Sequence, residues 1–154
     1  MSSRYLIVAT EAELSLPMAQ AALQGGYRTP IVTGVGATNI INALRNLPRH
    51  ADILNVGYCG SISFPVGTEH LIGSCRLWHP NVDFPELTYR LGPYQVTCLT
   101  SGDFVLDGAK LPPHSVVDME LAYIAAFGFQ ALGAIKYVSD NLNLQQYEES
   151  VKKL

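Results

Sequence analysis

Short apolar runs alternate with helix-like stretches along almost the whole chain, and this order limits the fold more than any other feature of the sequence. The runs are bounded by glycine, proline or small polar residues, which is typical of buried strands. We predict strands at residues 5–10, 29–33, 52–56, 69–78, 94–100, 115–117 and 132–138. We predict helices at residues 11–24, 38–47, 119–130 and 144–154. Such alternation indicates an α/β fold with a central, mostly parallel sheet.

The chain length and the absence of linkers indicate one domain. The 154 residues contain no internal repeat or low-complexity tract, so we expect a single domain over residues 1–154. The predicted strands at 69–78 and 94–100 have a more antiparallel character, which makes the sheet mixed. A proline-rich loop through Pro80, Pro85 and Pro93 joins them, and it is the segment that the sequence predicts least.

The charge content restricts the partners of the protein. The chain has 10 Lys and Arg against 13 Asp and Glu, for a net charge of −3. No basic block suggests a nucleic acid or an anionic membrane as partner. Only 15% of the residues are charged, whereas about 25% is ordinary for a soluble domain. We therefore expect a small molecule as ligand and a partner subunit that covers apolar surface, in a homodimer or higher homo-oligomer.

The cysteines, histidines and N-terminus indicate a reduced protein without a metal site. Cys59, Cys75 and Cys98 are odd in number and far apart, with no CxxC spacing and no histidine pair spaced for zinc. We expect no disulfide framework, no metal and no cofactor. Residues 1–14 resemble neither a signal peptide nor a spanning helix, so we expect a cytoplasmic location.

Polar residues or glycines follow six of the predicted strands. In open α/β sheets the ligand binds beyond the carboxyl ends of the strands, so these residues are expected to surround one crevice. They are Glu11 and Glu13, Gly34-Val35-Gly36, Gly57-Tyr58-Cys59-Gly60-Ser61, Ser101-Gly102-Asp103, Asp118-Met119-Glu120 and Ser139-Asp140-Asn141.

Each of these segments also has a purely structural interpretation. The Gly34-Val35-Gly36 turn could approach a phosphate, but Asn39 stands at the third glycine position of a dinucleotide fingerprint, which favours an ordinary tight turn. Glu13 could simply favour the first turn of a helix through the helix dipole. Asp118 could be only an N-cap.

The order of the motifs nevertheless resembles that of a known superfamily. Five segments carry the resemblance: Ile53–Gly60, with a strand and a G-x-x-G turn, Pro65–Glu69, Ser101–Asp103, Val117–Glu120 followed by Ala122, and Val138–Asp140. Together they resemble the nucleoside phosphorylase/nucleosidase superfamily, and most of all the methylthioadenosine/S-adenosylhomocysteine nucleosidases, in a shortened form. The resemblance implies a three-layer αβα sandwich with a central mixed, mostly parallel sheet.

The resemblance also implies a role for each polar residue of the crevice. Asp140 matches the general acid that protonates purine N7, and Ser139 would orient it. Glu120 matches the acid that binds the ribose 2′- and 3′-hydroxyl groups, with Met119 against the ribose face. Glu13 matches the residue that holds the attacking water. A protonated acid and an ionised base are the pair that such a reaction requires.

Further residues are placed around the substrate by the same resemblance. Val105 occupies the position of a purine-stacking aromatic, with Phe104 one place earlier, and Tyr147 resembles the aromatic that closes the 5′ side. Tyr58 stands where a small residue is usual, Asp118 where a glutamate is usual, and Lys136 where an arginine is usual. The substrate-binding set is Val35, Tyr58, Gly60, Phe104, Val105, Asp118, Met119, Glu120, Ser139 and Tyr147.

The first turn favours hydrolysis over phosphorolysis. Phosphorylases of this superfamily have an arginine there for the phosphate dianion, whereas this turn reads Ala9-Thr10-Glu11-Ala12-Glu13. We therefore expect a purine nucleosidase that hydrolyses the N-glycosidic bond of a 5′-modified adenosine or a related nucleoside. A phosphate-dependent phosphorylase and a catalytically impaired nucleoside-binding protein remain as alternatives. The segment from His79 to Phe84 resembles a loop that reaches a neighbouring subunit, or it is an ordinary surface loop.

Overall fold

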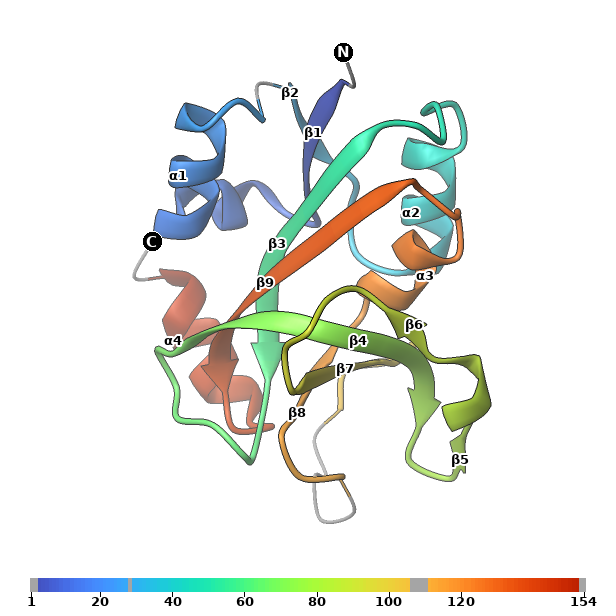
Figure 1. The fold of residues 1–154 in the computed structure, drawn as a ribbon. Coiled ribbons are helices and arrows are strands. Elements are labelled where there is room, and N and C mark those ends of the chain that lie inside the picture. The colour runs from blue at the N-terminus through green and yellow to red at the C-terminus, as the bar shows by residue number, and fades with distance from the viewer. Residues whose placement is uncertain (1–2, 28, 106–110, 153–154) are drawn as a thin grey trace.

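The computed structural model describes residues 3–27, 29–105 and 111–152, and in this part of the chain the predicted alternation of strands and helices is observed (Figure 1). The strands are β1 (Arg4–Val8), β2 (Thr29–Val32), β3 (Asp52–Gly60), β4 (Glu69–His79), β5 (Val82–Asp83), β6 (Tyr89–Arg90), β7 (Val96–Thr100), β8 (Ser115–Asp118) and β9 (Ala131–Asp140). The α-helices are α1 (Pro17–Gln24), α2 (Ala37–Leu44), α3 (Leu121–Ala125) and α4 (Leu144–Lys152), and two 3₁₀ turns are η1 (Glu11–Ser15) and η2 (Pro85–Leu87).

The mixed sheet curls until it closes on itself. β2, β1, β3 and β9 are parallel neighbours, β9 pairs antiparallel with β4, and β4, β7 and β8 are parallel again. β8 then returns to β3, where Gly60 pairs with Val117. The α/β class and the mixed sheet agree with the prediction, whereas the closed sheet differs from an open sandwich.

Register shifts explain how the sheet bends. One shift lies between Cys59 and Gly60 where β3 meets β9, and another lies between Ile72 and Ser74 where β4 meets β7. Such irregularities bend a strand and increase its twist. At Gly73 a side chain would also collide with the backbone of Tyr94, since a Cβ there would lie 1.8 Å from the Tyr94 carbonyl oxygen.

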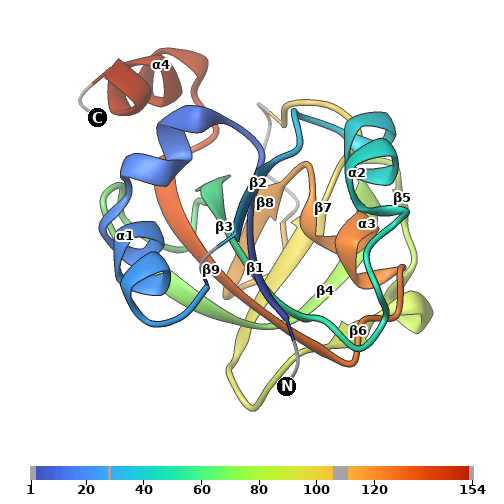
Figure 2. The ribbon, with the colours of Figure 1, turned by 90° about the horizontal axis from the view of Figure 1, so that it is seen from above.

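The helices flank the sheet in two pairs, with α1 and α4 on one side and α2 and α3 on the other (Figure 2). The period-two alternation of β1 explains why both sides are apolar. Leu6 and Val8 pack in the cluster beneath α1, and Ile7 packs with Ile40 and Leu44 of α2.

Several predicted elements have other bounds than the sequence indicated. The helix expected at residues 11–24 is interrupted before Pro17, because proline favours the first turn of a new helix. The helix expected at 119–130 is reduced to α3, and Gly128 adopts a left-handed φ of 72° after it. β3 and β9 extend beyond their predicted ends, and the proline-rich loop contains β5, η2 and β6. Among the described residues, no helix is long and apolar enough to span a membrane.

Candidate active site

One pocket opens at the carboxyl ends of β1, β3, β7, β8 and β9, and it is completed by the turn before α2 and by α4. Its empty space, including the open mouth, is about 550 Å³. The twelve residues predicted to be catalytic or substrate-binding all line this pocket: Glu13, Val35, Tyr58, Gly60, Phe104, Val105, Asp118, Met119, Glu120, Ser139, Asp140 and Tyr147. Other strand-end residues that were expected around the crevice do not line it: Glu11, Gly34, Gly36, Gly57, Ser61, Ser101, Gly102 and Asn141.

Glu13 is a buried carboxyl group held by three backbone N–H donors. Its Oε1 accepts hydrogen bonds from Ala9 at 2.7 Å and Thr10 at 2.9 Å, and its Oε2 accepts one from Tyr58 at 2.7 Å. Burial raises the pKa of Glu13, while the Lys136 ammonium group and the three donors act in the opposite direction. Gly57 makes room for this arrangement, because a Cβ there would lie 2.8 Å from Glu13 Oε2.

Asp140 is fixed at the end of β9. The Ser139 hydroxyl group donates a hydrogen bond to its Oδ1 at 2.7 Å, and the N–H groups of Leu142 and Asn143 donate to its Oδ2 at 2.9 and 3.2 Å. The residue is only 1% exposed. Burial raises the pKa of Asp140 despite these three donors, which favours the protonated form that a general acid needs.

Glu120 lies on another side of the pocket, just before α3. It is 8% exposed, and its Oε2 accepts a hydrogen bond from the Met119 N–H group at 2.9 Å. Burial and the neighbouring charge of Asp118 raise the pKa of Glu120 to about 8. The half-buried Met119 lines the pocket beside it.

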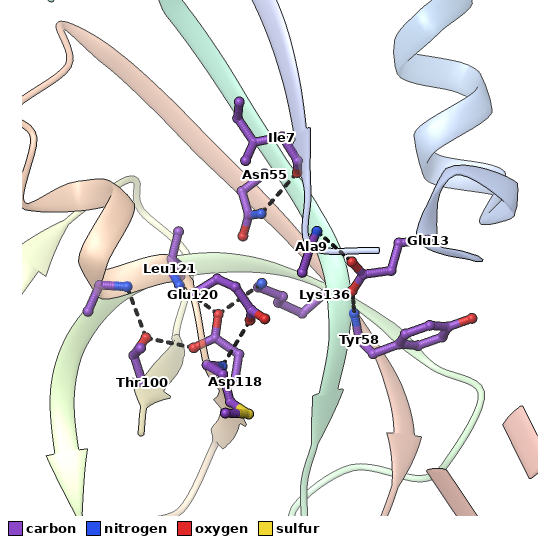
Figure 3. A network of polar contacts seen from close by, with 12 residues as sticks. Ile7, Ala9, Glu13, Asn55, Tyr58, Thr100, Asp118, Glu120, Leu121 and Lys136 are labelled. Carbon is purple, nitrogen blue, oxygen red and sulfur yellow. Dashed lines mark hydrogen bonds and ion pairs between the residues drawn. The ribbon is translucent and has the colours of Figure 1, made fainter. Parts of the chain in front are cut away.

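Lys136 forms an ion pair with Asp118 next to Glu120, and its ammonium group lies on the side of Glu13 (Figure 3). Lys136 Nζ is 2.9 Å from Asp118 Oδ2, and both side chains are almost completely buried. Burial alone would raise the pKa of Asp118, but Lys136 and the hydrogen-bond donors lower it. Burial alone would lower the pKa of Lys136, but Asp118 and Glu120 raise it.

The Asp118 carboxylate is held by three donors of the protein itself. Its Oδ1 accepts a hydrogen bond from the Thr100 hydroxyl group at 2.6 Å, and its Oδ2 accepts one from the Leu121 N–H group at 2.8 Å as well as the Lys136 ion pair. Asp118 is one of the residues predicted from the sequence to bind the substrate. The structure places it on the pocket wall with its carboxylate engaged by the protein, so it can support Glu120 and α3.

Aromatic side chains form one side of the pocket. Phe104 packs edge-to-face on Tyr147 with ring centroids 5.4 Å apart, and Tyr147 packs edge-to-face on Tyr58 at 6.0 Å. The Tyr58 ring points away from Asp118 and Glu120 in Figure 3 and packs in the apolar cluster beneath α1. The polar contact of Tyr58 with this site is therefore made by its backbone N–H group, which donates a hydrogen bond to Glu13.

Three of the predicted substrate-binding residues are nonpolar residues at the rim or in the wall of the pocket. Val35 is exposed at the rim, Val105 packs partly in the core, and Gly60 lies against Asp140. Leu142 also lines the pocket, although the sequence analysis did not select it. The described residues include no group of three or more side chains suited to hold a metal ion.

The comparisons with known proteins agree on the fold. No family model matches the sequence, and no curated protein matches it significantly. Among solved structures, a nucleosidase (MTAN) of Chlamydia trachomatis bound to adenine has a TM-score of 0.77 and 19% identity, covering 100% of this chain and 91% of that chain. Futalosine hydrolase of Helicobacter pylori has a TM-score of 0.75 and 14% identity, covering 99% and 91%.

A further match is the 5′-methylthioadenosine/S-adenosyl homocysteine nucleosidase of Helicobacter pylori, with a TM-score of 0.67, 14% identity, and coverage of 99% of this chain and 93% of that chain. The structural likeness extends over nearly the whole chain at low identity, and it agrees with the resemblance found in the sequence motifs. The protein therefore has the fold of the methylthioadenosine/S-adenosylhomocysteine nucleosidases.

Proposed function

We propose that this protein is a purine nucleosidase, which hydrolyses the N-glycosidic bond of a 5′-modified adenosine or a related nucleoside. The observation that carries the proposal is the meeting of Glu13, Glu120 and Asp140 in one pocket, on three different strand ends. The structural neighbours are nucleosidases crystallised with adenine or a nucleoside analogue, and a futalosine hydrolase. Their fold and this set of carboxyl groups support the same reaction class.

Asp140 acts as the general acid in this proposal. Its proton is donated to N7 of the purine while the bond between the base and C1′ of the sugar breaks, so the base leaves as a neutral molecule. Burial of the carboxyl group favours the protonated state before the reaction. General acid catalysis of this kind contributes about 10²- to 10⁴-fold in rate.

Glu13 acts on the other reactant, a water molecule. An ionised carboxylate has about four acceptor positions, and three in Glu13 are taken by backbone N–H groups. The remaining position can hold a water, whose oxygen attacks C1′ and whose proton passes to Glu13. The three fixed donors hold the carboxylate in one orientation, which favours a defined attack geometry.

Glu120 binds the sugar. Its Oε2 accepts only the Met119 N–H group among the described contacts, so the carboxylate has acceptor positions for two adjacent ribose hydroxyl groups. Because the pKa of Glu120 is about 8, the group has to lose its proton when the substrate binds, and its negative charge then stabilises the positive charge that develops on the sugar.

The electrostatics of the pocket favour water over phosphate as nucleophile. The charged side chains that line the pocket in the described part of the chain are acidic, and the nearby Lys136 is paired with Asp118. A phosphate dianion would enter beside Glu13 and Asp103 without a cation to bind it. We therefore favour hydrolysis over phosphorolysis.

The test is product analysis with methylthioadenosine, adenosylhomocysteine, adenosine and inosine, each with and without phosphate. Base release with a free sugar product in phosphate-free buffer is expected. Strictly phosphate-dependent formation of a sugar 1-phosphate would establish the phosphorylase instead. Binding of adenine or a nucleoside without any cleavage would establish the impaired binding protein.

A further inference from the structure

Leu142 has an unusual backbone conformation at the edge of the pocket. Its φ is +65°, in the left-handed region that a large apolar side chain rarely adopts. Such conformations cost energy, and they persist where the surrounding contacts enforce them, often at functional sites. The residue lies in the segment Asn141–Asn143, which connects β9 to α4.

Hydrogen bonds on both sides of Leu142 hold the segment in this conformation. The Asn141 side chain donates to the carbonyl oxygens of Ser61 at 2.6 Å and Phe64 at 3.1 Å. The side chain of Asn143 accepts a hydrogen bond from the N–H group of Gln146 at 3.0 Å, in the first turn of α4. The segment is thus anchored to the loop after β3 at one end and to α4 at the other.

The N–H group and the side chain of Leu142 both serve the surroundings of Asp140. The N–H group donates to Asp140 Oδ2 at 2.9 Å. The side chain is 6% exposed and packs with Trp78, Leu99 and Val117. A Cβ added to Gly60 would lie 2.7 Å from Leu142 Cδ2 and 3.0 Å from Asp140 Oδ2, so the leucine methyl group and the carboxyl group lie side by side over this glycine.

We propose that Leu142 is a positioning residue, whose side chain shields the Asp140 carboxyl group from water while its strained backbone fixes the orientation of that group. The inference rests on the proposed function, because it concerns how Asp140, the proposed general acid, is kept protonated. It differs from the role of Ser139, which donates to the other carboxyl oxygen. A polar or smaller residue at position 142 would admit water to Asp140 Oδ2.

No other charge explains the protonated state of Asp140 in the described surroundings. The titratable groups that face it are Cys59 on β3 and Tyr147 on α4. Burial raises the pKa of both groups, so both are neutral near pH 7. Exclusion of water is then the main influence that favours the protonated carboxyl group, against three hydrogen-bond donors that favour its charged form.

Two substitutions separate the side chain from the backbone. Leu142→Ala removes the shielding and keeps the strain, whereas Leu142→Gly removes both, because glycine adopts positive φ at no steric cost. Leu142→Met is the matched control, since it keeps an apolar side chain of similar volume. The measurements are kcat/KM for a nucleoside that the wild type cleaves and the affinity for adenine, each over pH 5 to 9.

The alanine and glycine variants are expected to lose activity at lower pH than the wild type. As the pKa of the acid falls toward the ordinary aspartate value, the protonated fraction of Asp140 at a given pH falls, and the pH at which activity is lost falls with it. As pH rises, the affinity of these two variants for adenine should also begin to fall at a lower pH than that of the wild type. Leu142→Met should keep the wild-type pH profile for both activity and adenine affinity. The glycine variant should have a higher Tm than the alanine variant, because glycine adopts the positive φ of position 142 without strain. A pH shift that both variants share despite this difference in Tm is then not a consequence of poorer folding.

An unchanged pH profile in both the alanine and the glycine variants would overturn the proposal, even if their stability or kcat fell. Asp140→Asn distinguishes the two levels of inference. If that variant cleaves nucleosides as fast as the wild type, the proposed acid is wrong. If it is inactive while the Leu142 variants keep the wild-type profile, only the role of Leu142 is wrong.

Discussion

Replacing Lys136 with methionine removes the ammonium group that compensates Asp118 and leaves a side chain of similar length. The two groups are 2.9 Å apart and 1% and 0% exposed, so the remaining carboxylate cannot be solvated by water. Removing one member of a buried pair costs about 3–5 kcal/mol. For a chain of this length, that loss lowers Tm by roughly 10 °C. Urea unfolding of Lys136→Met at pH 8 measures the loss directly.

The pH dependence of this variant tests the same reasoning independently. In the wild type the pKa of Asp118 is lowered, so its stabilisation is present above the unfolded aspartate value of about 3.9 and is lost as pH falls through the folded value. Without Lys136, burial raises the pKa of Asp118, so as pH falls from 8 to 5 the stability of the variant should increase by more than the increase expected for the wild type from Glu120. The double variant Lys136→Met with Asp118→Asn should recover part of the lost free energy.

A loss below about 1 kcal/mol in Lys136→Met would place the pair in the range of exposed ion pairs and refute the reasoning. The reasoning would also be refuted if the loss of unfolding free energy in the double variant equalled the sum of the losses in the two single variants, because the two side chains would then not be coupled. The two positions are among those at which the sequence departs from the pattern that the resemblance implies. The ion pair accounts for both departures, because the aspartate at position 118 and the lysine at position 136 are in direct contact with each other.

Three further predictions concern Glu120, Gly57 and the apolar surface. The raised pKa of Glu120, about 8, means that its stabilisation is full below the unfolded value and is lost as pH rises through 8. Wild-type unfolding free energy should therefore increase by about 2 kcal/mol from pH 8 to pH 6, and an equal increase in Glu120→Gln would contradict this. Gly57→Ala places a Cβ 2.8 Å from Glu13 Oε2 and 3.2 Å from Lys136 Nζ. Urea unfolding should therefore show a loss of about 1–3 kcal/mol in the free energy of unfolding, and base-release assays should show a loss of activity. Wild-type values in both assays would refute the close approach. Light scattering after size-exclusion chromatography should give a dimer or larger assembly, because apolar side chains of β4 to β6 such as Val82, Phe84 and Leu87 are 41–54% exposed, and a clean monomer at micromolar concentration would exclude this.

The location of the candidate site could be predicted from the sequence because it depends on strand ends. Glu13, Glu120 and Asp140 each follow an apolar run, and the ends of those runs meet at one edge of the sheet. Residues far apart in the chain were therefore placed together without knowledge of their contacts. The helix and strand types followed from the same periodic patterns.

The contacts inside the site could not be predicted, because they depend on the closure of the sheet and on local backbone angles. Lys136 meets Asp118 because β9 and β8 both lie beside β3. The register shift at Cys59 and Gly60, which accompanies this closure, has no signature in the residue types. The left-handed conformation of Leu142 contradicts its residue preference and arises from hydrogen bonds to distant segments.

Base release from methylthioadenosine by the wild type and by Asp140→Asn tests the central claim most directly. Asparagine preserves the size of the side chain but cannot be the acid, and parallel titrations with adenine show whether the variant pocket still binds a base. The account predicts cleavage by the wild type and a loss of about 10²- to 10⁴-fold in the variant, with adenine binding still detectable. Equal rates of base release in the two proteins would contradict it.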